Sequence, residues 1–273
     1  MKIGNREFSI GKHTYIMGIL NMTPDSFSDG GKYRDMDKAL FRAGEMISEG
    51  AAILDVGGES TRPGAVKISA QEEMERVLPL LERLKDTYDI PLSLDTYKGE
   101  VAAAGIRAGA DMINDVSGLS QDPAMAGIIA ESGSACCLMH SVGEKIRGDV
   151  MDRIRRDFEK ILKRAEQAGI EKERIVLDPG IGFGKDYPQN LEVIRRIGQL
   201  QELGYPVLLG TSRKSVIGIT LKVPVEERLT GTLVTGVMGI LGGCAFLRVH
   251  DVRAHVEAVR MTEAILYGGE AVL

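Results

Sequence analysis

The sequence is poor in cysteine. Its three cysteines are Cys136, Cys137 and Cys244, an odd number of which two are adjacent on an apolar run. This arrangement gives neither a disulfide framework nor the spacing of a metal-ligand set. We expect buried free thiols in a protein of a reducing compartment.

Long apolar runs and an excess of basic residues are also missing. No stretch approaches the roughly 20 apolar residues of a membrane span, and the amino terminus lacks the pattern of a secretion signal. The formal net charge of −5 argues against nonspecific nucleic-acid binding, which needs a basic surface. We therefore expect a cytoplasmic protein that binds neither membranes nor nucleic acids. A few local cations could still bind an anionic small molecule.

Short apolar runs that end in an acid recur along the chain. Asp178 ends the run at 175–177 and precedes Pro-Gly-Ile-Gly-Phe-Gly-Lys, while Asp55, Asp95 and Asp115 end similar runs. Runs of this length followed by breaking residues predict buried strands that each deliver a carboxylate to a loop. Acids at the ends of several such strands indicate a polar mouth at one end of a parallel sheet.

Strand and helix patterns alternate behind a small amino-terminal flap at 1–13. Strands are predicted at 15–20, 51–56, 91–95, 111–116, 134–140, 175–177, 206–209 and 246–249. Helices are predicted at 36–49, 69–84, 98–107, 122–131, 150–167, 188–202, from 215 to about 241 with an interruption near Pro224, and at 252–266. No compositional break divides the chain. The pattern predicts one α/β domain over residues 1–273, a (β/α)8 TIM barrel.

A doubly wound open sheet is the structural alternative. It would normally carry a G-x-G-x-x-G turn after its first strand, where this chain has the loop at 21–31.

Two of the predicted helices carry distinctive local patterns. Ser69 with Glu72 predicts an N-cap and capping box, and the basic face of the helix at 150–167 is typical of a solvated surface.

In a barrel, the strand ends and following loops would collect polar residues at one mouth. These are Asn21, Asp55, Asp95, Asn114, Asp115, His140, Asp178, Lys214, Arg248 and His250. Two carboxylates, an amide and an ammonium suit the edge of a planar heterocycle, because a carboxylate accepts two parallel N–H bonds. That set is Asp95, Asn114, Asp178 and Lys214.

Arg248, His250 and the backbone N–H groups of glycine-rich loops would suit an anion. Phosphate sites in barrels often lie near the seventh and eighth strands, which favours this placement. For Asp55 and Asp115, bracing a loop and contacting a ligand are equally open readings.

The same residues carry a resemblance to the dihydropteroate synthase family over essentially the whole chain. The matching motifs lie in order at 18–31, 55–64, 94–96, 113–118, 138–140, 178–185, 212–214 and 248–252. The resemblance implies that 7,8-dihydropterin-6-ylmethyl diphosphate and 4-aminobenzoate condense to 7,8-dihydropteroate and diphosphate. This is an SN1-like displacement in folate biosynthesis, and sulfonamides target the family.

The resemblance also implies roles for particular residues. Catalysis would rest on Asp95, Lys214, Arg248 and His250. The pterin would contact Asp95, Asn114, Met139, Asp178, Phe183, Gly210 and Lys214. The 4-aminobenzoate would contact Phe27, Thr61, Arg62, Pro63, Phe183 and Ser215. The diphosphate would contact Asn21, Thr61, Arg248 and His250, with Asn21 as a ligand of Mg²⁺. A homodimer through the helices around the seventh and eighth strands is implied as well.

One stretch departs from the family pattern, and three other functions compete. After His140 the family often runs Met-x-Gly-x-Pro, whereas this chain has Ser-Val-Gly-Glu-Lys at 141–145. A methyltetrahydrofolate–corrinoid methyltransferase would share the barrel and the pterin-site Asp and Asn. It would not be expected to carry the Thr-Pro-Asp-Ser-Phe-Ser, Ser-Thr-Arg-Pro and Arg-Val-His-Asp motifs, all of which this chain has. An aldolase would need Lys214 in an apolar setting. A non-catalytic pterin-binding paralogue would have no use for diphosphate ligands.

Overall fold

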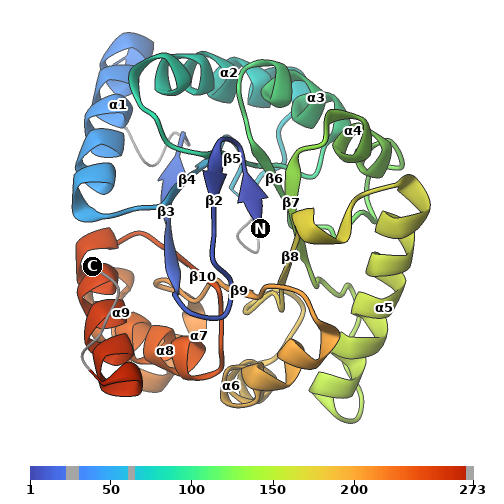
Figure 1. The fold of residues 1–273 in the computed structure, drawn as a ribbon, viewed down its shortest axis with the longest axis vertical. Coiled ribbons are helices and arrows are strands. Elements are labelled where there is room, and N and C mark those ends of the chain that lie inside the picture. Colours follow the sequence, from blue (N-terminus) through green and yellow to red (C-terminus); the bar gives the residue numbers. More distant parts are fainter. Residues whose placement is uncertain (23–30, 61–64, 269–273) are drawn as a thin grey trace.

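Eight parallel strands form the centre of the structure, a computed structural model that describes residues 1–22, 31–60 and 65–268 (Figure 1). They are β3 (Tyr15–Asn21), β4 (Ile53–Gly57), β5 (Leu92–Asp95), β6 (Met112–Asp115), β7 (Ala135–Met139), β8 (Ile175–Asp178), β9 (Leu208–Leu209) and β10 (Phe246–Val249). Their order is β8-β7-β6-β5-β4-β3-β10-β9. The two ends meet where Leu177 N donates to Pro206 O over 2.9 Å and Leu177 bridges Val207. The predicted barrel is confirmed, and the open doubly wound sheet is wrong.

Helices form the outer ring: α1 to α8 lie between consecutive strands of the chain, and α9 follows the last strand (Figure 1). They are α1 (Gly31–Glu49), α2 (Ala70–Thr87), α3 (Gly99–Arg107), α4 (Met125–Ser132), α5 (Val150–Ala168), α6 (Tyr187–Arg195), α7 (Ser215–Leu221), α8 (Leu229–Leu241) and α9 (Val252–Tyr267). Short 3-10 turns are η2 (Lys172–Arg174), η3 (Ile197–Leu203) and η4 (Val225–Glu227). The interruption predicted near Pro224 is confirmed, because η4 separates α7 from α8. The helix predicted at 188–202 divides instead into α6 and η3.

The amino-terminal flap is an antiparallel hairpin of β1 (Lys2–Ile3) and β2 (Arg6–Glu7). Ile3 and Phe8 are buried in one cluster with barrel residues such as Met112 and Phe246. In Figure 1 the hairpin lies over the middle of the barrel. It therefore fills the end of the barrel opposite the carboxyl ends of the strands, and leaves the polar end as the place for a ligand.

Side chains of each strand alternate between the barrel interior and the helices. On β6, Met112 belongs to the interior cluster with the hairpin, whereas Ile113 belongs to the larger cluster between barrel and helices. The next interior position on β6 is Asn114. Inside the barrel, β6 thus places the apolar Met112 near the hairpin and the polar Asn114 nearer the carboxyl end of the strand.

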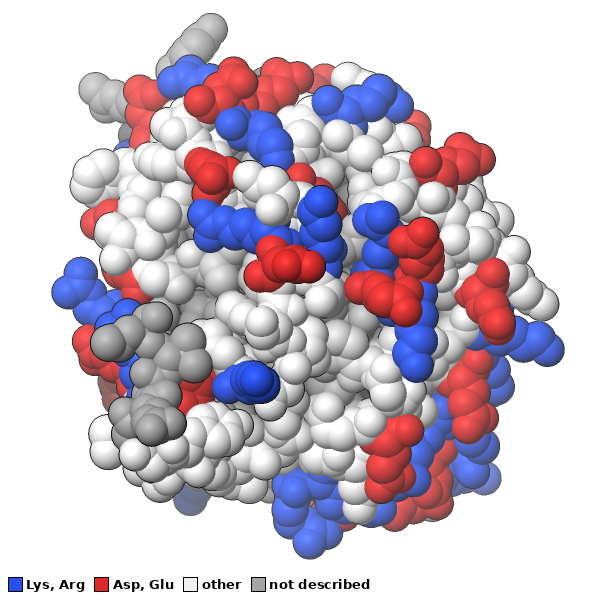
Figure 2. All heavy atoms as spheres, in the orientation of Figure 1, with Lys and Arg blue, Asp and Glu red and all other residues white. Residues whose placement is uncertain are grey.

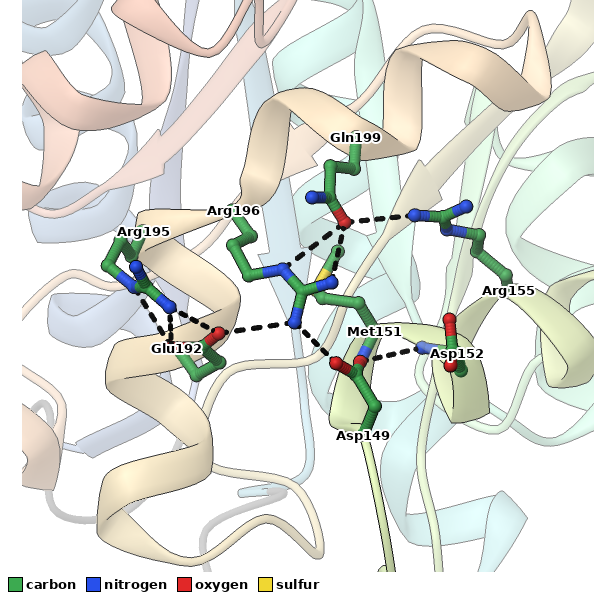
Figure 3. Close-up of polar contacts among 8 residues, drawn as sticks. All are labelled: Asp149, Met151, Asp152, Arg155, Glu192, Arg195, Arg196 and Gln199. Atoms are coloured by element: carbon green, nitrogen blue, oxygen red, sulfur yellow. Dashed lines mark hydrogen bonds and ion pairs between the residues drawn. The ribbon is translucent and has the colours of Figure 1, made fainter.

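Helix boundaries follow local chemistry. The hydroxyl of Ser69 accepts a hydrogen bond from Glu72 N over 3.1 Å, which confirms the predicted N-cap of α2. The predicted capping box does not form among the described residues, because Glu72 Oε1 accepts from Arg76 Nη2 over 2.5 Å and not from Ser69 N. Asp149 caps α5 in the same way and also receives Arg196, which links α5 to α6 and η3 (Figure 3). A cap satisfies backbone N–H groups that have no partner within the helix.

The basic face of α5 is paired with acids. Arg153 bonds Asp157 on the same helix, and Arg155 bonds Glu202 on η3. Charges of both signs are interspersed over the face seen in Figure 2. Such pairing supports the interpretation of this run as a solvated surface. Within the described ranges, no helix combines the length and apolar character that crossing a membrane requires.

Candidate functional site

Arg248 on β10 lies at the centre of the polar end of the barrel. Its Nε donates to Asp55 Oδ2 over 2.6 Å, and its Nη2 donates to Asp95 Oδ2 over 2.7 Å. Asp55 also accepts from Ser93 Oγ over 2.5 Å and from Asn114 Nδ2 over 3.5 Å. Asp55 is completely buried. Asp55 therefore acts as a supporting group that orients Arg248, Ser93 and Asn114. Of the two roles that the sequence left open for Asp55, these bonds support bracing.

Asp95 has one oxygen without a partner. Its Oδ1 is buried and makes no hydrogen bond to any described residue, while Oδ2 is bound by Arg248. Burial raises the pKa of Asp95 to about 7, against the opposing effect of Arg248. Buried polar atoms are almost always hydrogen-bonded. A ligand that brings an N–H group to this oxygen would satisfy it.

Asp178, Gly210 and Lys214 form the facing side. Gly180 N donates to Asp178 Oδ1 over 2.7 Å, which fixes the carboxylate at the end of β8. A Cβ placed on Gly210 would lie 3.7 Å from Asp178 Oδ2, 3.9 Å from Lys214 Nζ and 3.9 Å from Arg248 Cβ. The missing side chain thus leaves space directly beside the three charged residues. A flat ligand could enter there.

The Lys214 ammonium is held over the loop after β8. Its Nζ donates to Ile181 O over 2.6 Å and lies 4.8 Å from the ring centre of Phe183. Burial lowers the pKa of Lys214 to about 8, although Asp178 opposes the shift. Burial also raises the pKa of Asp178, again against its partner. Lys214 bonds a backbone carbonyl and lies in the electrostatic field of Asp178 and Asp95, which differs from the apolar setting that an aldolase lysine would need.

His250, Asn21 and Ser215 border the same end. His250 Nδ1 lies 2.9 Å from Ser212 Oγ, and this hydroxyl also accepts from His250 N over 3.1 Å. The Asn21 amide oxygen lies 3.1 Å from where Gly57 would carry a Cβ, and Asp95 Oδ2 lies 3.9 Å from the same point. Ser215 is the exposed first residue of α7. Imidazole, amide and hydroxyl groups thus accompany the carboxylates.

Two predicted members of the mouth point elsewhere. His140 Nε2 lies 3.2 Å from Asp157 Oδ2 on α5, and burial lowers the pKa of His140 to about 4. Asp115 accepts from Ser117 N over 2.8 Å and from Leu119 N over 2.7 Å, so it braces the loop after β6. His140 therefore does not join the predicted mouth, and for Asp115 the loop-bracing reading, one of the two left open, is the one that these bonds support. Alternation explains it, since the neighbours Met139 and Asn114 take the interior positions.

Other predicted contacts are only partly described. Met139 and Gly210 are buried at the ends of β7 and β9, and Phe183 is half-buried. Four predicted residues lie outside the described ranges: Phe27, Thr61, Arg62 and Pro63. The described residues before and after 61–64 are fixed by Glu59, which accepts from Lys98 Nζ over 2.6 Å and from Ile68 N over 3.3 Å.

The sequence interpretation missed Ser93 and Ser212 as supporting groups. Ser93 lies two residues before Asp95 on the same strand, so alternation places both side chains on one face. That spacing was the available signal for Ser93. For Ser212 no comparable signal existed, because its contact with His250 joins residues 38 positions apart.

Comparisons with known proteins agree with this geometry. The model of the family described as pterin binding enzyme matches residues 17–250. A dihydropteroate synthase of Clostridium beijerinckii is 52% identical over 97% of this chain and 99% of its own length.

Solved structures of such enzymes superpose closely on this fold. A dihydropteroate synthase of Clostridium difficile, determined in the presence of pteroic acid, has a TM-score of 0.93 at 50% identity, covering 95% of this chain and 99% of its own. A Xanthomonas albilineans dihydropteroate synthase in complex with 7,8-dihydropteroate has a TM-score of 0.87 at 38% identity, covering 95% and 96%. From the family match and the identity along nearly the whole chain, it follows that this protein belongs to the pterin binding enzyme family.

Proposed function

We propose that the protein is a dihydropteroate synthase, which condenses 7,8-dihydropterin-6-ylmethyl diphosphate with 4-aminobenzoate to give 7,8-dihydropteroate and diphosphate. The observation that carries the proposal is a pair of buried carboxylates at one mouth: Asp95 bonds Arg248, and Asp178 borders the space at Gly210 together with Lys214 and Arg248. The relatives named above support it, because two of them were solved with pteroic acid or 7,8-dihydropteroate.

The pterin ring would bind in the space beside Gly210. Asp178 would accept two N–H bonds from the amino-pyrimidinone edge, and Asp95 Oδ1 would accept one from the opposite part of the ring. Asn114, whose amide already donates to Asp55, would present its oxygen to the ligand. Lys214 would donate to a ring acceptor. Met139 would form part of the pocket wall.

The diphosphate would lie toward Arg248, His250 and Asn21. Mg²⁺ usually takes one or two protein ligands and completes its shell with phosphate oxygens and water. The amide oxygen of Asn21, beside Asp95 at the end of β3, is an oxygen donor of the kind that Mg²⁺ prefers, so it fits as a ligand of Mg²⁺ carried by the substrate. When bound, the ion would neutralise charge on the leaving diphosphate. Thr61 would contact the diphosphate as well.

The 4-aminobenzoate would lie next to the pterin methylene. Phe183, whose ring faces Lys214, and Ser215 at the start of α7 would contact it. A helix N-terminus favours an anion, which suits the carboxylate of this substrate. The remaining contacts would come from Phe27, Thr61, Arg62 and Pro63.

The reaction would proceed by ionisation before capture. Arg248 and His250 would stabilise the charge that develops on the departing diphosphate. The Asp95 carboxylate would stabilise the positive charge on the pterin methylene, and the weakly nucleophilic aniline would then attack. Asp95, Lys214, Arg248 and His250 are therefore the proposed catalytic residues. No covalent enzyme intermediate is required.

The assembly is proposed to be a homodimer in the cytoplasm, with residues 1–273 as one domain. Support comes from exposed apolar residues on one face of α8, at spacings of four and three: Val234, Met238 and Leu241. Met261 and Ile265 on the adjacent α9 are exposed as well. Contiguous exposed apolar surface usually marks an interaction site. We call these five residues the α8–α9 apolar face.

The direct test measures diphosphate release from the pterin diphosphate with Mg²⁺, with and without 4-aminobenzoate, in wild type and Lys214→Ala. We expect turnover that requires 4-aminobenzoate, that a sulfonamide inhibits, and that the substitution largely removes. Pterin binding without diphosphate release would favour a non-catalytic binder. Methyl transfer from methyltetrahydrofolate to a corrinoid would favour the methyltransferase.

A further inference from the structure

Lys185, the residue that ends the glycine-rich motif after β8, is buried with 7% exposure. Its Nζ donates to His140 O over 3.3 Å, to Gly180 O over 3.0 Å and to Phe183 O over 3.2 Å. The ammonium is thus held by three backbone carbonyls. Burying a charge is costly unless it is hydrogen-bonded, so these three bonds define where the loop at 179–184 can lie.

The opposite side of this loop is bound by Lys214. The carbonyls of Gly180 and Phe183 face Lys185, while Ile181 O accepts from Lys214 over 2.6 Å. Gly180 and Gly182, on either side of Ile181, have φ of 67° and 85°, a left-handed backbone that favours glycine. Two lysines therefore fix the same short loop from either side.

The loop also packs tightly against the segment after β7. A Cβ on Gly180 would lie 2.0 Å from His140 O, and one on Gly184 would lie 2.0 Å from Val142 O. The two backbones touch, and Lys185 bridges them through His140 O. Loss of this bridge would let the loop move away from the segment after β7, carrying Ile181 O and Phe183 with it.

We propose that Lys185 is a positioning residue for pterin binding: it fixes the 179–184 loop so that Ile181 O and the Phe183 ring hold Lys214 at the ligand. The inference deepens the proposed function and rests on it. Lys185 touches no substrate in this account. It acts through the position of Lys214, and a displacement of about 1 Å can cost on the order of a hundredfold in an enzyme reaction.

The test is a double-mutant cycle of Lys185→Met and Lys214→Ala. In each variant, calorimetry measures the affinity for pterin-6-ylmethyl diphosphate, the fully oxidised form of the proposed substrate. We expect Lys185→Met to weaken binding by about tenfold in the wild-type background and less than about twofold in the Lys214→Ala background, because interacting residues are not additive. Lys185→Gln, which keeps two N–H donors, should bind between Lys185→Met and wild type.

Lys85→Met is the matched control. Lys85 bonds Asp111 at the other end of the barrel, so its loss should leave pterin affinity unchanged. If Lys185→Met does not fold, Lys185→Gln takes its place in the cycle. Equal losses in both backgrounds, or no loss, would overturn the inference while leaving the proposed function intact. Absence of binding in the wild type would overturn both.

Discussion

At the scale of single residues, the central arrangement is one guanidinium shared by two carboxylates. Asp55 and Asp95 both accept from Arg248, and they raise the pKa of Arg248 further although burial opposes this. Only Asp95 keeps an oxygen for a ligand, since Asp55 is satisfied by Ser93 and Asn114. The two acids therefore differ in role although both end similar strands.

Asp55→Asn should damage catalysis without removing a substrate contact. Loss of one partner of a buried ion pair typically lowers the free energy of unfolding by about 3–5 kcal/mol, because the other charge is left buried without its partner. Here Arg248 keeps Asp95 as a second partner. We expect kcat/KM to fall by about 10- to 100-fold, since Arg248 loses the carboxylate that orients it. Ser93→Ala, which removes only one neutral donor to Asp55, should cost less than about tenfold. A wild-type kcat/KM in Asp55→Asn would show that Asp55 does not orient Arg248.

The pH dependence follows from two shifted groups. Asp95, whose pKa is raised to about 7, must lose its proton to stabilise a cation, so kcat/KM for the pterin substrate should rise as pH passes about 7. Lys214, whose pKa is lowered to about 8, must keep its proton to donate, so kcat/KM should fall above about 8. A narrow bell-shaped profile in steady-state kinetics is expected. An alkaline limb that persists in Lys214→Met would contradict the assignment to Lys214.

At the scale of elements, the loop at 179–184 depends on the absence of a side chain at Gly180. Gly180→Ala would place a Cβ 2.0 Å from His140 O at a φ of 67°. We expect a loss of about 2 kcal/mol or more in the free energy of unfolding by urea. Gly127→Ala in α4 is the control, because no atom lies within 4 Å and alanine favours a helix by about 1 kcal/mol. Equal stability of the two variants would refute the packing argument.

The sequence predicted the elements well because each carries a local signal. Ser69 capped α2 as its spacing with Glu72 predicted, and the strand β10 begins and ends at the predicted residues. What failed was the direction of side chains such as His140. Strands of a barrel are buried on both faces, so they are uniformly apolar, and the alternation that would identify the inner face is hidden.

At the scale of the whole molecule, the order of strands and helices determined the fold, and the fold explains most of the site. Residues as distant as Asp55 and Arg248 meet because parallel strands deliver their carboxyl ends to one mouth. Contacts that depend on tertiary packing could not be predicted. The Lys185 carbonyl contacts and the Ser212–His250 bond have no spacing signal in the sequence.

The α8–α9 apolar face predicts how subunits meet. Met238→Glu would place a charge among apolar side chains, so it should dissociate the proposed dimer. Sedimentation should then give a mass near the 29.6 kDa of one chain, against about twice that for wild type. Phe41→Glu is the control, because Phe41 is 71% exposed on α1 and is not one of the five residues of this face. A dimer that survives Met238→Glu would place the interface elsewhere.

The central claim is that strand-end carboxylates hold a pterin edge, and calorimetric titration of wild type and Asp178→Asn with 6-hydroxymethyl-7,8-dihydropterin tests it most directly. Losing a charged acceptor of two N–H bonds should cost about 2–4 kcal/mol, or roughly 30- to 1,000-fold in affinity. Asp111→Asn at the opposite end of the barrel should bind like wild type. The predicted result is that Asp178→Asn binds the pterin more weakly by about this factor, while wild type and Asp111→Asn bind it equally. Unchanged affinity in Asp178→Asn would contradict the account.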